Sequence, residues 1–332
     1  MEKRVLLTDY VWPSVEPERI VLQNAGVELV VAPDSEEDTL VSLSKDIDGI
    51  LTCFAQITGS ILRSASQCVV VGRCGVGVDN IDVGVATELG IAVTYVPDYC
   101  VDEVSDHVMA LMHTWNRRII TFDRSVRENG WGTLPLTMRI MRLRGKKFGV
   151  IGFGRIGQAV SSKARAFGLN VLTYDPYLSQ SEGSRAGAEV VDLQTLLKES
   201  DFVSLHCPLT AETRHLIGKP ELNIMKRDAF LINAARGPLV DEEALYQALK
   251  NGQIAGAGVD VLTESSPPND HPLFQLQNLI ITPHVAFFSQ ESTLELEHRA
   301  AREVIRVLNN DMPENLVNPQ VINHSRANLN RK

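Results

Sequence analysis

The residues with the most definite chemical meaning are the glycines of the segment Gly152-Phe153-Gly154-Arg155-Ile156-Gly157, which follows the apolar run 148–151 and leads into a helical pattern. In a strand-turn-helix unit, the first glycine of such a fingerprint allows a tight turn, the second lets the backbone approach a pyrophosphate, and the third lets the helix pack closely on the strand. The N–H groups of the helix N-terminus then face the phosphates. The pattern predicts a dinucleotide site at Gly152, Gly154 and Gly157.

An acidic residue follows this fingerprint at the spacing that a dinucleotide site requires. Asp175 lies 18 residues after Gly157, at the end of the apolar run 171–174. A carboxylate at this position accepts hydrogen bonds from the adenosine ribose hydroxyls and repels a 2′-phosphate. Asp175 therefore favours NAD over NADP as the cofactor.

Three later segments each place a polar side chain just beyond an apolar run, and they carry Arg236, Asp260 and His284. In an open parallel sheet, ligands bind in the crevice outside the carboxyl ends of the strands. Next to a nicotinamide, a guanidinium and an imidazole suit the reduction of a 2-oxo acid, because the first holds the carboxylate and carbonyl oxygens and the second donates a proton. The alternatives are a surface ion pair for Arg236, a loop histidine for His284 and a simple strand end for Asp260.

The elements that must position these residues form two series of apolar runs that alternate with helical segments, which indicates two parallel sheets. The first series comprises 4–8, 27–31, 49–52, 69–73 and 92–96. The second comprises runs near 148, 171 and 190, then 202–205, 229–232, 256–261 and 279–281. Apolar residues at helical spacing predict a long connecting helix over 101–129 and a final helix over 292–308 that returns to the first domain.

We therefore expect an α/β fold with two Rossmann/flavodoxin-like domains, each built on a parallel sheet. An NAD-binding domain, residues 101–289, is inserted into a discontinuous substrate domain that comprises residues 1–100 and 290–332. Closure of the two domains would exclude water from the reaction, with hinges near 96–101 and 287–292.

The composition narrows the class of protein. The 332 residues carry a net charge of -9 and are 44% hydrophobic, which argues against general attraction to nucleic acids or membrane surfaces. No apolar stretch approaches the roughly 20 residues needed to span a bilayer, and the chain passes into a strand pattern with no signal peptide, so we expect a cytoplasmic protein. The five cysteines include no Cys-x-x-Cys pair, which predicts reduced thiols and no metal site.

Taken in order, these segments resemble the NAD-dependent, D-isomer-specific 2-hydroxyacid dehydrogenase family, which includes phosphoglycerate, glycerate and D-lactate dehydrogenases. The resemblance covers nearly the whole chain and includes 72–82 (Gly-Arg-Cys-Gly-Val-Gly-Val-Asp-Asn-Ile-Asp) and 206–210 (His-Cys-Pro-Leu-Thr). The stretches 96–106 and 313–319 look most like the branch near the C-terminal binding protein corepressors. The family implies an oxidoreductase whose partner is a small 2-oxo or 2-hydroxy acid.

The resemblance also implies roles for individual residues. Arg236 resembles the family's substrate arginine and His284 its acid/base histidine, while backbone N–H groups at Val76 and Gly77 would hold the substrate carboxylate. The implied cofactor contacts run from the pyrophosphate to the nicotinamide carboxamide. Besides the three glycines, they comprise Arg155, Ile156, Asp175, Cys207, Pro208, Thr213, Ala234, Arg236, Asp260 and His284.

One position departs from the family pattern. Members usually have a glutamate five residues after the position of Asp260, and here that position is Ser265, with Glu264 one residue earlier as a possible substitute. A carboxylate stabilises an imidazolium, whereas a serine offers only a neutral hydrogen bond. Three functions therefore remain open: ordinary 2-hydroxyacid oxidoreduction, altered NAD-linked chemistry, and a non-catalytic NAD(H)-sensing protein that resembles the corepressors.

Aromatic and apolar residues bear on the substrate and on assembly. Phe54, Phe287 and Phe288 either line a pocket for an apolar 2-oxo acid or pack in the core. If they line a pocket, phenylpyruvate is a better substrate than a phosphorylated acid. The helix that starts at 101 carries more apolar surface than one core contact needs, so it forms either a homodimer face, as the family implies, or an intradomain contact.

Overall fold

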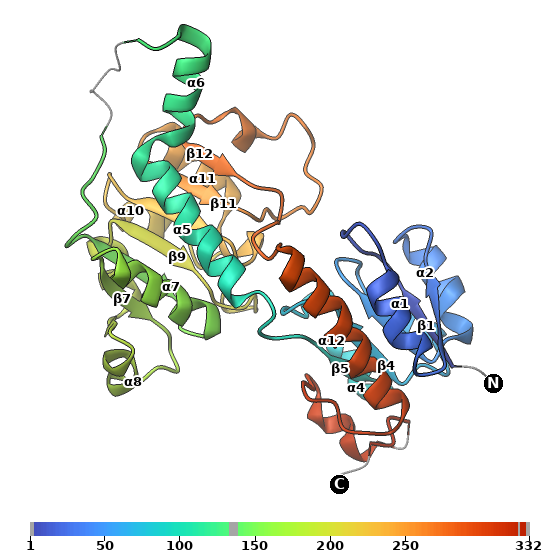
Figure 1. The fold of residues 1–332 in the computed structure, drawn as a ribbon. Coiled ribbons are helices and arrows are strands. Elements are labelled where there is room, and N and C mark those ends of the chain that lie inside the picture. Colours follow the sequence, from blue (N-terminus) through green and yellow to red (C-terminus); the bar gives the residue numbers. More distant parts are fainter. Residues whose placement is uncertain (1–2, 133–138, 325, 330–332) are drawn as a thin grey trace. The chain divides into compact units, whose positions relative to one another are not determined.

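The computed structural model describes residues 3–132, 139–324 and 326–329. The chain separates into two compact units, Met1–Tyr99 with Ser289–Lys332 and Cys100–Phe288, which we describe one at a time (Figure 1). Within the described ranges, no helix is both long and apolar enough to cross a membrane.

The first unit contains a five-stranded parallel sheet in the order β2-β1-β3-β4-β5. All five apolar runs expected for the first sheet are strands. They are β1 Lys3–Leu7, β2 Val27–Val31, β3 Gly49–Thr52, β4 Val70–Arg73 and β5 Ala92–Thr94.

Helices cover both faces of this sheet. One face carries α2 Glu37–Leu43, α3 Gly59–Ser64 and α4 Val83–Glu88, whose apolar residues join the core cluster of the strands. The long helix α12, Gln290–Leu308, packs against α1, Glu16–Gln23, and against β3 and β4. The side chain of Ser289 caps the start of α12 by accepting a hydrogen bond from Ser292 N, at 2.9 Å. Short 3-10 turns occur at Ser44–Asp46 and Pro319–Asn323.

The second unit contains a seven-stranded parallel sheet in the order β12-β11-β10-β9-β6-β7-β8. Its strands are β6 Lys147–Ile151, β7 Asn170–Tyr174, β8 Glu189–Val190, β9 Phe202–Leu205, β10 Phe230–Asn233, β11 Gly256–Val259 and β12 Leu279–Ile281. The chain builds outward from β6 to β8 and then crosses back to β9 on the other side of β6. This reversal of strand order creates a crevice beside the carboxyl end of β6, where ligands bind in such sheets.

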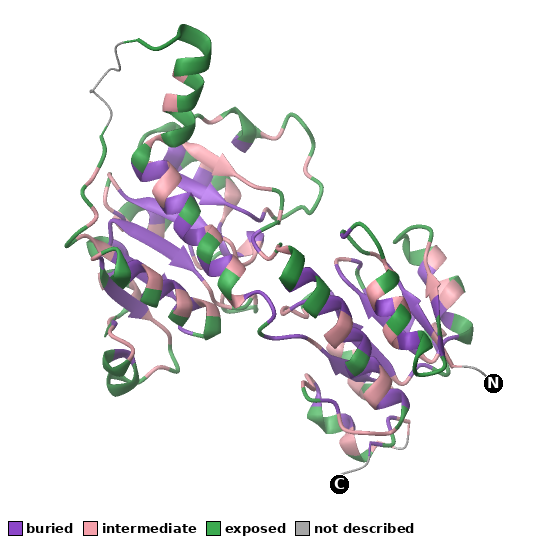
Figure 2. Cartoon of the chain, in the orientation of Figure 1, coloured by how far each residue is buried: buried purple, intermediate pink, exposed green. Residues whose placement is uncertain are grey.

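Both faces of the second sheet are covered, as a parallel sheet requires. On one face lie α5 Val101–Arg117 and α7 Arg155–Ala166, and on the other lie α9 Leu193–Glu199, α10 Lys219–Ile224 and α11 Glu242–Lys250. The strands between them are largely buried (Figure 2), and the Trp115 ring stacks on Phe230 with centroids 4.9 Å apart. Two further helices, α6 Ile119–Asn129 and α8 Gln180–Arg185, and 3-10 turns at Gly237–Leu239 and Pro272–Gln275 complete the unit.

The prediction of one continuous helix over 101–129 is wrong. The chain turns at Arg118, whose φ of 55° lies in the left-handed region, so that α5 ends and α6 starts there. The guanidinium of Arg118 lies 3.7 Å from the centroid of the Trp115 ring, a cation–π contact that helps to stabilise the turn. Whereas α5 buries one face, none of the described residues of α6 is buried.

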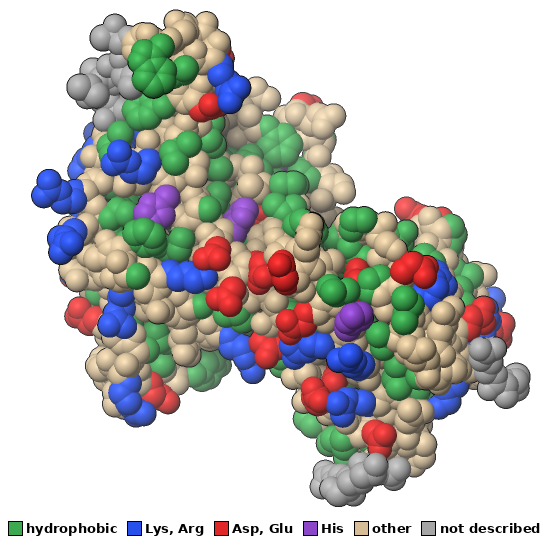
Figure 3. All heavy atoms as spheres, in the orientation of Figure 1, with side chains coloured by type: hydrophobic (Ala, Val, Ile, Leu, Met, Phe, Trp, Pro, Cys, Tyr) green, Lys and Arg blue, Asp and Glu red, His purple; other side chains and the backbone are tan. Residues whose placement is uncertain are grey.

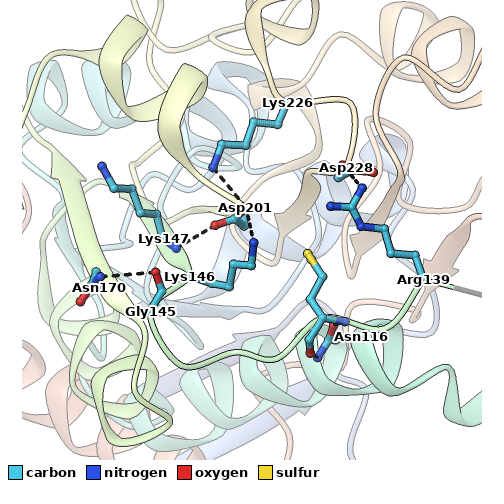
Figure 4. Close-up of polar contacts among 10 residues, drawn as sticks. Asn116, Arg139, Gly145, Lys146, Lys147, Asn170, Asp201, Lys226 and Asp228 are labelled. Carbon is cyan, nitrogen blue, oxygen red and sulfur yellow. Dashed lines mark hydrogen bonds and ion pairs between the residues drawn. The ribbon is translucent and has the colours of Figure 1, made fainter.

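A buried carboxylate organises the amino edge of this sheet, opposite the crevice (Figure 4). Asp201 accepts hydrogen bonds from Lys147 N at 2.9 Å and from Lys226 Nζ at 3.1 Å, and Lys146 Nζ lies 3.7 Å away. These contacts tie the start of β6 to the start of β9 and to the loop before β10. The lysines that gather here therefore serve a structural carboxylate.

Candidate active site

The glycine loop after β6 has the geometry that the fingerprint predicts. Gly152 adopts φ +88°, and a Cβ there would lie 2.6 Å from Cys207 N on the neighbouring loop. A Cβ on Gly157 would lie 2.2 Å from Gly152 O, so neither position accepts a side chain. In contrast, apart from the glycine itself and its chain neighbours, no atom of the described residues lies within 4 Å of the position of a Cβ on Gly154. The loop thus leaves open space at Gly154, directly before the first turn of α7.

The N-terminus of α7 is a suitable site for phosphates. The helix begins at Arg155, and its N-cap residue Gly154 has no side chain to accept hydrogen bonds from the first turn. Free N–H groups at a helix N-terminus bind anions. A pyrophosphate therefore fits this end of α7.

Asp175 follows β7, the strand next to β6. Its Oδ2 accepts a hydrogen bond from Phe153 N at 2.8 Å, and its Oδ1 accepts one from Tyr177 N at 2.9 Å. The carboxylate thus holds the glycine loop. Because a carboxylate has about four lone-pair sites, each oxygen of the half-buried Asp175 can accept a further hydrogen bond from a ribose hydroxyl.

The segment after β9 lies against the glycine loop. His206 N donates to Ile151 O at 2.7 Å, and burial lowers the pKa of its imidazole to about 3, so this ring is neutral. Burial raises the pKa of the Cys207 thiol to about 11, which makes it a packing group rather than a nucleophile. Further along, Thr213 Oγ1 donates to Pro208 O at 2.7 Å and braces the loop. The structure therefore brings Gly152 and Cys207 together, as expected of one site.

The turn after β10 carries Ala234 and Arg236. Asn233, which is 1% exposed, braces this turn: its Nδ2 donates to Arg236 O at 2.8 Å, and its Oδ1 accepts from Ala235 N at 3.1 Å. The guanidinium of Arg236 is half-buried and donates to Ala235 O at 2.8 Å. Sequence reasoning missed Asn233, although an amide side chain at the end of an apolar run is a signal for such a brace.

Asp260, at the end of β11, holds the loop that carries His284. Its Oδ1 accepts from Thr282 Oγ1 at 2.5 Å and from Val285 N at 3.0 Å, and its Oδ2 accepts from Ala286 N at 2.9 Å. Its backbone oxygen accepts from His284 N at 2.7 Å. Because the residue is 1% exposed, its carboxylate oxygens receive their hydrogen bonds from these donors within the protein. Asp260 therefore positions His284 in this structure, and its contact with the cofactor stays a prediction.

His284 itself adopts a backbone conformation that side chains rarely take. Its φ is 54°, and a left-handed conformation costs a non-glycine residue about 1 to 2 kcal/mol. The hydrogen bonds to Asp260 on both sides of His284 offset that cost. The imidazole meets the Phe287 ring edge-on, with centroids 6.1 Å apart, while Phe288 is 53% exposed.

Neither candidate for the missing glutamate contacts His284. Glu264 and Ser265 are both exposed, and no hydrogen bond or ion pair joins them to any residue that the structure describes. Their loop is anchored one residue earlier, where Thr263 N donates to the Glu242 carboxylate, which also lies 3.6 Å from His271 Nε2. The loop that carries Glu264 is thus fastened to Glu242 and not to His284.

In the first unit, the loop after β4 offers free backbone donors. The N–H groups of Val76 and Gly77 donate to no residue within the described ranges. Asn80 fastens this loop to the loop after β3, because its Nδ2 donates to Ala55 O at 2.9 Å. Consecutive free amides in a fixed loop suit a carboxylate.

Arg73, at the end of β4, is a candidate that sequence reasoning missed. Its side chain donates to Cys74 O, and its guanidinium carbon lies 6.0 Å from the centroid of the Phe54 ring. The residue is 6% exposed, yet its Nε has no acceptor among the described residues. A buried cation with donor capacity to spare attracts an anion. In the sequence, the signal for this role is an arginine at the end of an apolar run, in Gly72-Arg73-Cys74-Gly75.

Comparison with known proteins gives the family. Residues 109–286 match the family described as "D-isomer specific 2-hydroxyacid dehydrogenase, NAD binding domain". A glyoxylate reductase from Korarchaeum cryptofilum is 40% identical over 294 residues, which cover 88% of this chain and 88% of that protein. The chain belongs to the D-isomer-specific 2-hydroxyacid dehydrogenase family.

Other relatives of this dehydrogenase differ in substrate and cofactor. A D-3-phosphoglycerate dehydrogenase from Methanocaldococcus jannaschii is 39% identical over 317 residues, which span 95% of this chain and 59% of that protein. The structure of an Aquifex aeolicus D-lactate dehydrogenase complexed with NAD and lactic acid has a TM-score of 0.85 at 27% identity and covers 92% of this chain and 96% of its own. An acyclic imino acid reductase in complex with NADPH and D-Arg has a TM-score of 0.84 at 29% identity, over 95% of this chain and 99% of its own.

These matches confirm the predicted family and the α/β fold with two parallel sheets. The dehydrogenase is an NAD(P)-linked oxidoreductase, as the glycine fingerprint indicates. Within the described ranges, no cluster of His, Cys, Asp and Glu side chains is suited to hold a metal ion. The roles of single residues and the choice between NAD and NADP stay predictions.

Proposed function

We propose that this dehydrogenase interconverts a 2-oxo acid and the corresponding D-2-hydroxy acid with NAD(H), with Arg236 binding the substrate and His284 acting as the acid/base group. The observation that carries the proposal is the rigid placement of His284 at the end of β12, tied on both sides to the buried Asp260. The braced turn with Arg236 and the glycine loop lie at the same edge of the same sheet.

The cofactor site that we propose comprises the glycine loop, the start of α7 and the ends of the neighbouring strands. Its members are Gly152, Gly154, Arg155, Ile156, Gly157, Asp175, Cys207, Pro208, Thr213, Ala234 and Asp260. When bound, NADH supplies a hydride to C2 of the substrate, and NAD⁺ accepts it in the reverse direction. The Asp175 carboxylate supports NAD over NADP, because it would repel a 2′-phosphate.

The protein groups then bind the substrate and move one proton. The amides of Val76 and Gly77 take the substrate carboxylate, and the buried guanidinium of Arg73, which lies next to Gly75, adds positive charge. Arg236 polarises the carbonyl oxygen. During reduction, the imidazole of His284 donates a proton to that oxygen, and during oxidation it accepts the proton from the hydroxyl.

The test is NADH oxidation by the purified protein with glyoxylate, hydroxypyruvate, pyruvate, phenylpyruvate and 3-phosphohydroxypyruvate. We expect turnover that falls at least a hundredfold in Arg236→Ala and in His284→Gln, because charge stabilisation and proton transfer each contribute about that much. If the partly buried rings of Phe54 and Phe287 line the substrate pocket, we expect turnover of phenylpyruvate to exceed that of 3-phosphohydroxypyruvate. Tight NADH binding without turnover of any acid would instead favour a binding protein.

A second candidate function is the reduction of 2-imino acids, which the position of Ser265 favours. A protonated imine already carries its proton on nitrogen, so its reduction to an amine needs no proton from His284. Glu264 and Ser265, the two candidates for supporting this acid, form no hydrogen bond or ion pair with any residue that the structure describes. The structural similarity to an acyclic imino acid reductase supports this candidate.

The two functions differ in their response to amines. If the protein reduces imino acids, then methylamine added to pyruvate will accelerate NADH oxidation, and mass spectrometry will detect N-methylalanine. If NADH oxidation is equal with and without methylamine, and lactate is the product, the protein reduces 2-oxo acids. Methylamine with no acid present is the matched control.

The apolar residues Met109, Met112 and Trp115 of α5, which the sequence offered as a dimer face, are buried in the core of the second unit, so their packing is the intradomain alternative. The homodimer expected from the family is still a proposal, and α6 supports it. Ile119, Ile120 and Val126 are 54%, 46% and 36% exposed. Figure 3 shows hydrophobic side chains on the surface over this helix. An exposed apolar helix face is typical of an interface between subunits.

A further inference from the structure

A histidine on α5 lies behind the loop that carries His284. The imidazole of His107 is 21% exposed, and its Nε2 lies 2.9 Å from Thr282 Oγ1 and 3.7 Å from Asp260 Oδ1. His107 and Thr282 are 175 positions apart in the sequence, so the fold brings them together.

The direction of the hydrogen bond follows from the contacts of Thr282. A hydroxyl has a single hydrogen, and Thr282 Oγ1 donates it to Asp260 Oδ1 at 2.5 Å. In the contact with His107, the threonine oxygen must therefore accept. His107 Nε2 carries the hydrogen and donates it, whether the ring is neutral or charged.

This donation continues a chain of hydrogen bonds that ends at His284. Asp260 accepts from Thr282 and also from Val285 N and Ala286 N, at 3.0 and 2.9 Å. These amides belong to the two residues after His284, whose left-handed backbone conformation needs such support. A donor on α5 thus fixes the hydroxyl that orients the buried carboxylate, and the carboxylate fixes the loop.

We infer that His107 is a positioning residue that acts through Thr282 and Asp260 to hold His284 in place for proton transfer. The inference rests on the proposed role of His284 as the acid/base group. His107 does not need to touch the substrate or the cofactor for this role. Loss of the donor should therefore affect turnover more than cofactor affinity.

Two substitutions separate this role from simple packing. His107→Leu fills a similar volume but removes the donor, whereas His107→Gln can place an amide N–H near the position of Nε2. We expect His107→Leu to lower kcat about tenfold to a hundredfold, the range for a lost hydrogen bond in a network around a charged group, with the NADH Kd within about threefold of wild type. We expect His107→Gln to restore kcat to within about fivefold of wild type.

His113→Leu, on the same helix, is the matched control. The His113 ring packs against Phe167, with centroids 4.3 Å apart, and its Nε2 has no hydrogen-bond partner among the described residues. This variant should keep the wild-type kcat. If His107→Leu does so as well, or if His107→Gln is as impaired as His107→Leu, His107 is not a positioning residue.

A readout without turnover keeps the inference separate from the proposed function. In ¹H–¹⁵N NMR spectra, the amide signals of Val285 and Ala286 report their hydrogen bonds to Asp260. They should move upfield in His107→Leu and stay near their wild-type positions in His107→Gln and His113→Leu. Absence of turnover in the wild type would refute the proposed function, while unchanged amide signals in His107→Leu would refute the positioning role.

Discussion

Glu297→Gln should make the first unit more stable at neutral and alkaline pH. Glu297 lies on α12 and is 4% exposed. Burial raises the pKa of its carboxyl to about 8, and the nearby Glu18 adds like charge. The side chain is therefore protonated in the folded protein near pH 7, whereas it is ionised in the unfolded chain.

The sign and size of the pH dependence follow from these two pKa values. Below the unfolded pKa of about 4.3, both states hold the proton, and the full stability is present. As the pH rises toward 8, the unfolded chain releases the proton and the folded protein keeps it, so the free energy of unfolding falls. One pKa unit corresponds to about 1.4 kcal/mol, which gives a loss of about 2 kcal/mol between pH 6 and pH 8. Glutamine cannot ionise and should remove this loss.

Urea denaturation at pH 6, 7 and 8 measures the effect. The fluorescence of Trp12 reports on the first unit, close to the site, because its Nε1 donates to Glu18 Oε1 at 3.1 Å. The other two tryptophans, Trp115 and Trp131, are replaced by phenylalanine so that only Trp12 contributes to the signal. Glu295→Gln, an exposed position on the same helix, is the control and should keep the wild-type slope. An unchanged slope in Glu297→Gln would show that another group carries the raised pKa.

Three further predictions concern the cofactor, the second unit and assembly. Asp175→Ser should raise the ratio of kcat/KM for NADPH to that for NADH at least tenfold, because one repulsion near the surface is worth about 1 to 4 kcal/mol; equal ratios would contradict the role of Asp175. His206, whose folded pKa of about 3 lies below the unfolded value of about 6.5, should cost about 2 kcal/mol of stability as the pH falls from 6.5 to 4.5. His206→Gln should abolish that loss in acid denaturation, and an equally steep loss would count against it. Ile119→Glu with Ile120→Glu should halve the mass measured by light scattering, whereas a monomeric wild type would refute the proposed interface.

The sequence predicts the sheets well because their signal is local. Each parallel strand is a short apolar run between helical segments, and burial on both faces requires such runs. It also places Arg236, Asp260 and His284 at strand ends, because the carboxyl edge of a parallel sheet collects the residues that directly follow the strands. The fingerprint and Asp175 are equally local, since both lie within one strand-helix-strand unit.

What the sequence does not predict depends on contacts between distant residues. Arg118 is neither glycine nor asparagine, so nothing local marks its left-handed turn. The burial of Asp260 by three donors depends on a loop more than 20 residues further along. The anchoring of Thr263 by Glu242 likewise joins two separate loops. Such contacts follow from tertiary packing, which neither composition nor periodicity encodes.

A carboxylate next to an acid/base histidine can perform two tasks. A glutamate beside the histidine both orients the ring and strengthens it as a base. Here orientation of the loop has its own support, because Asp260 holds the backbone on both sides of His284 independently of position 265. With Ser265 at the position where the family resemblance implies a glutamate, the loop that carries His284 is therefore still held in place. A loop held in this way suits both candidate functions, because a 2-oxo acid needs a proton from a well-placed imidazole, whereas a protonated imine brings its own proton.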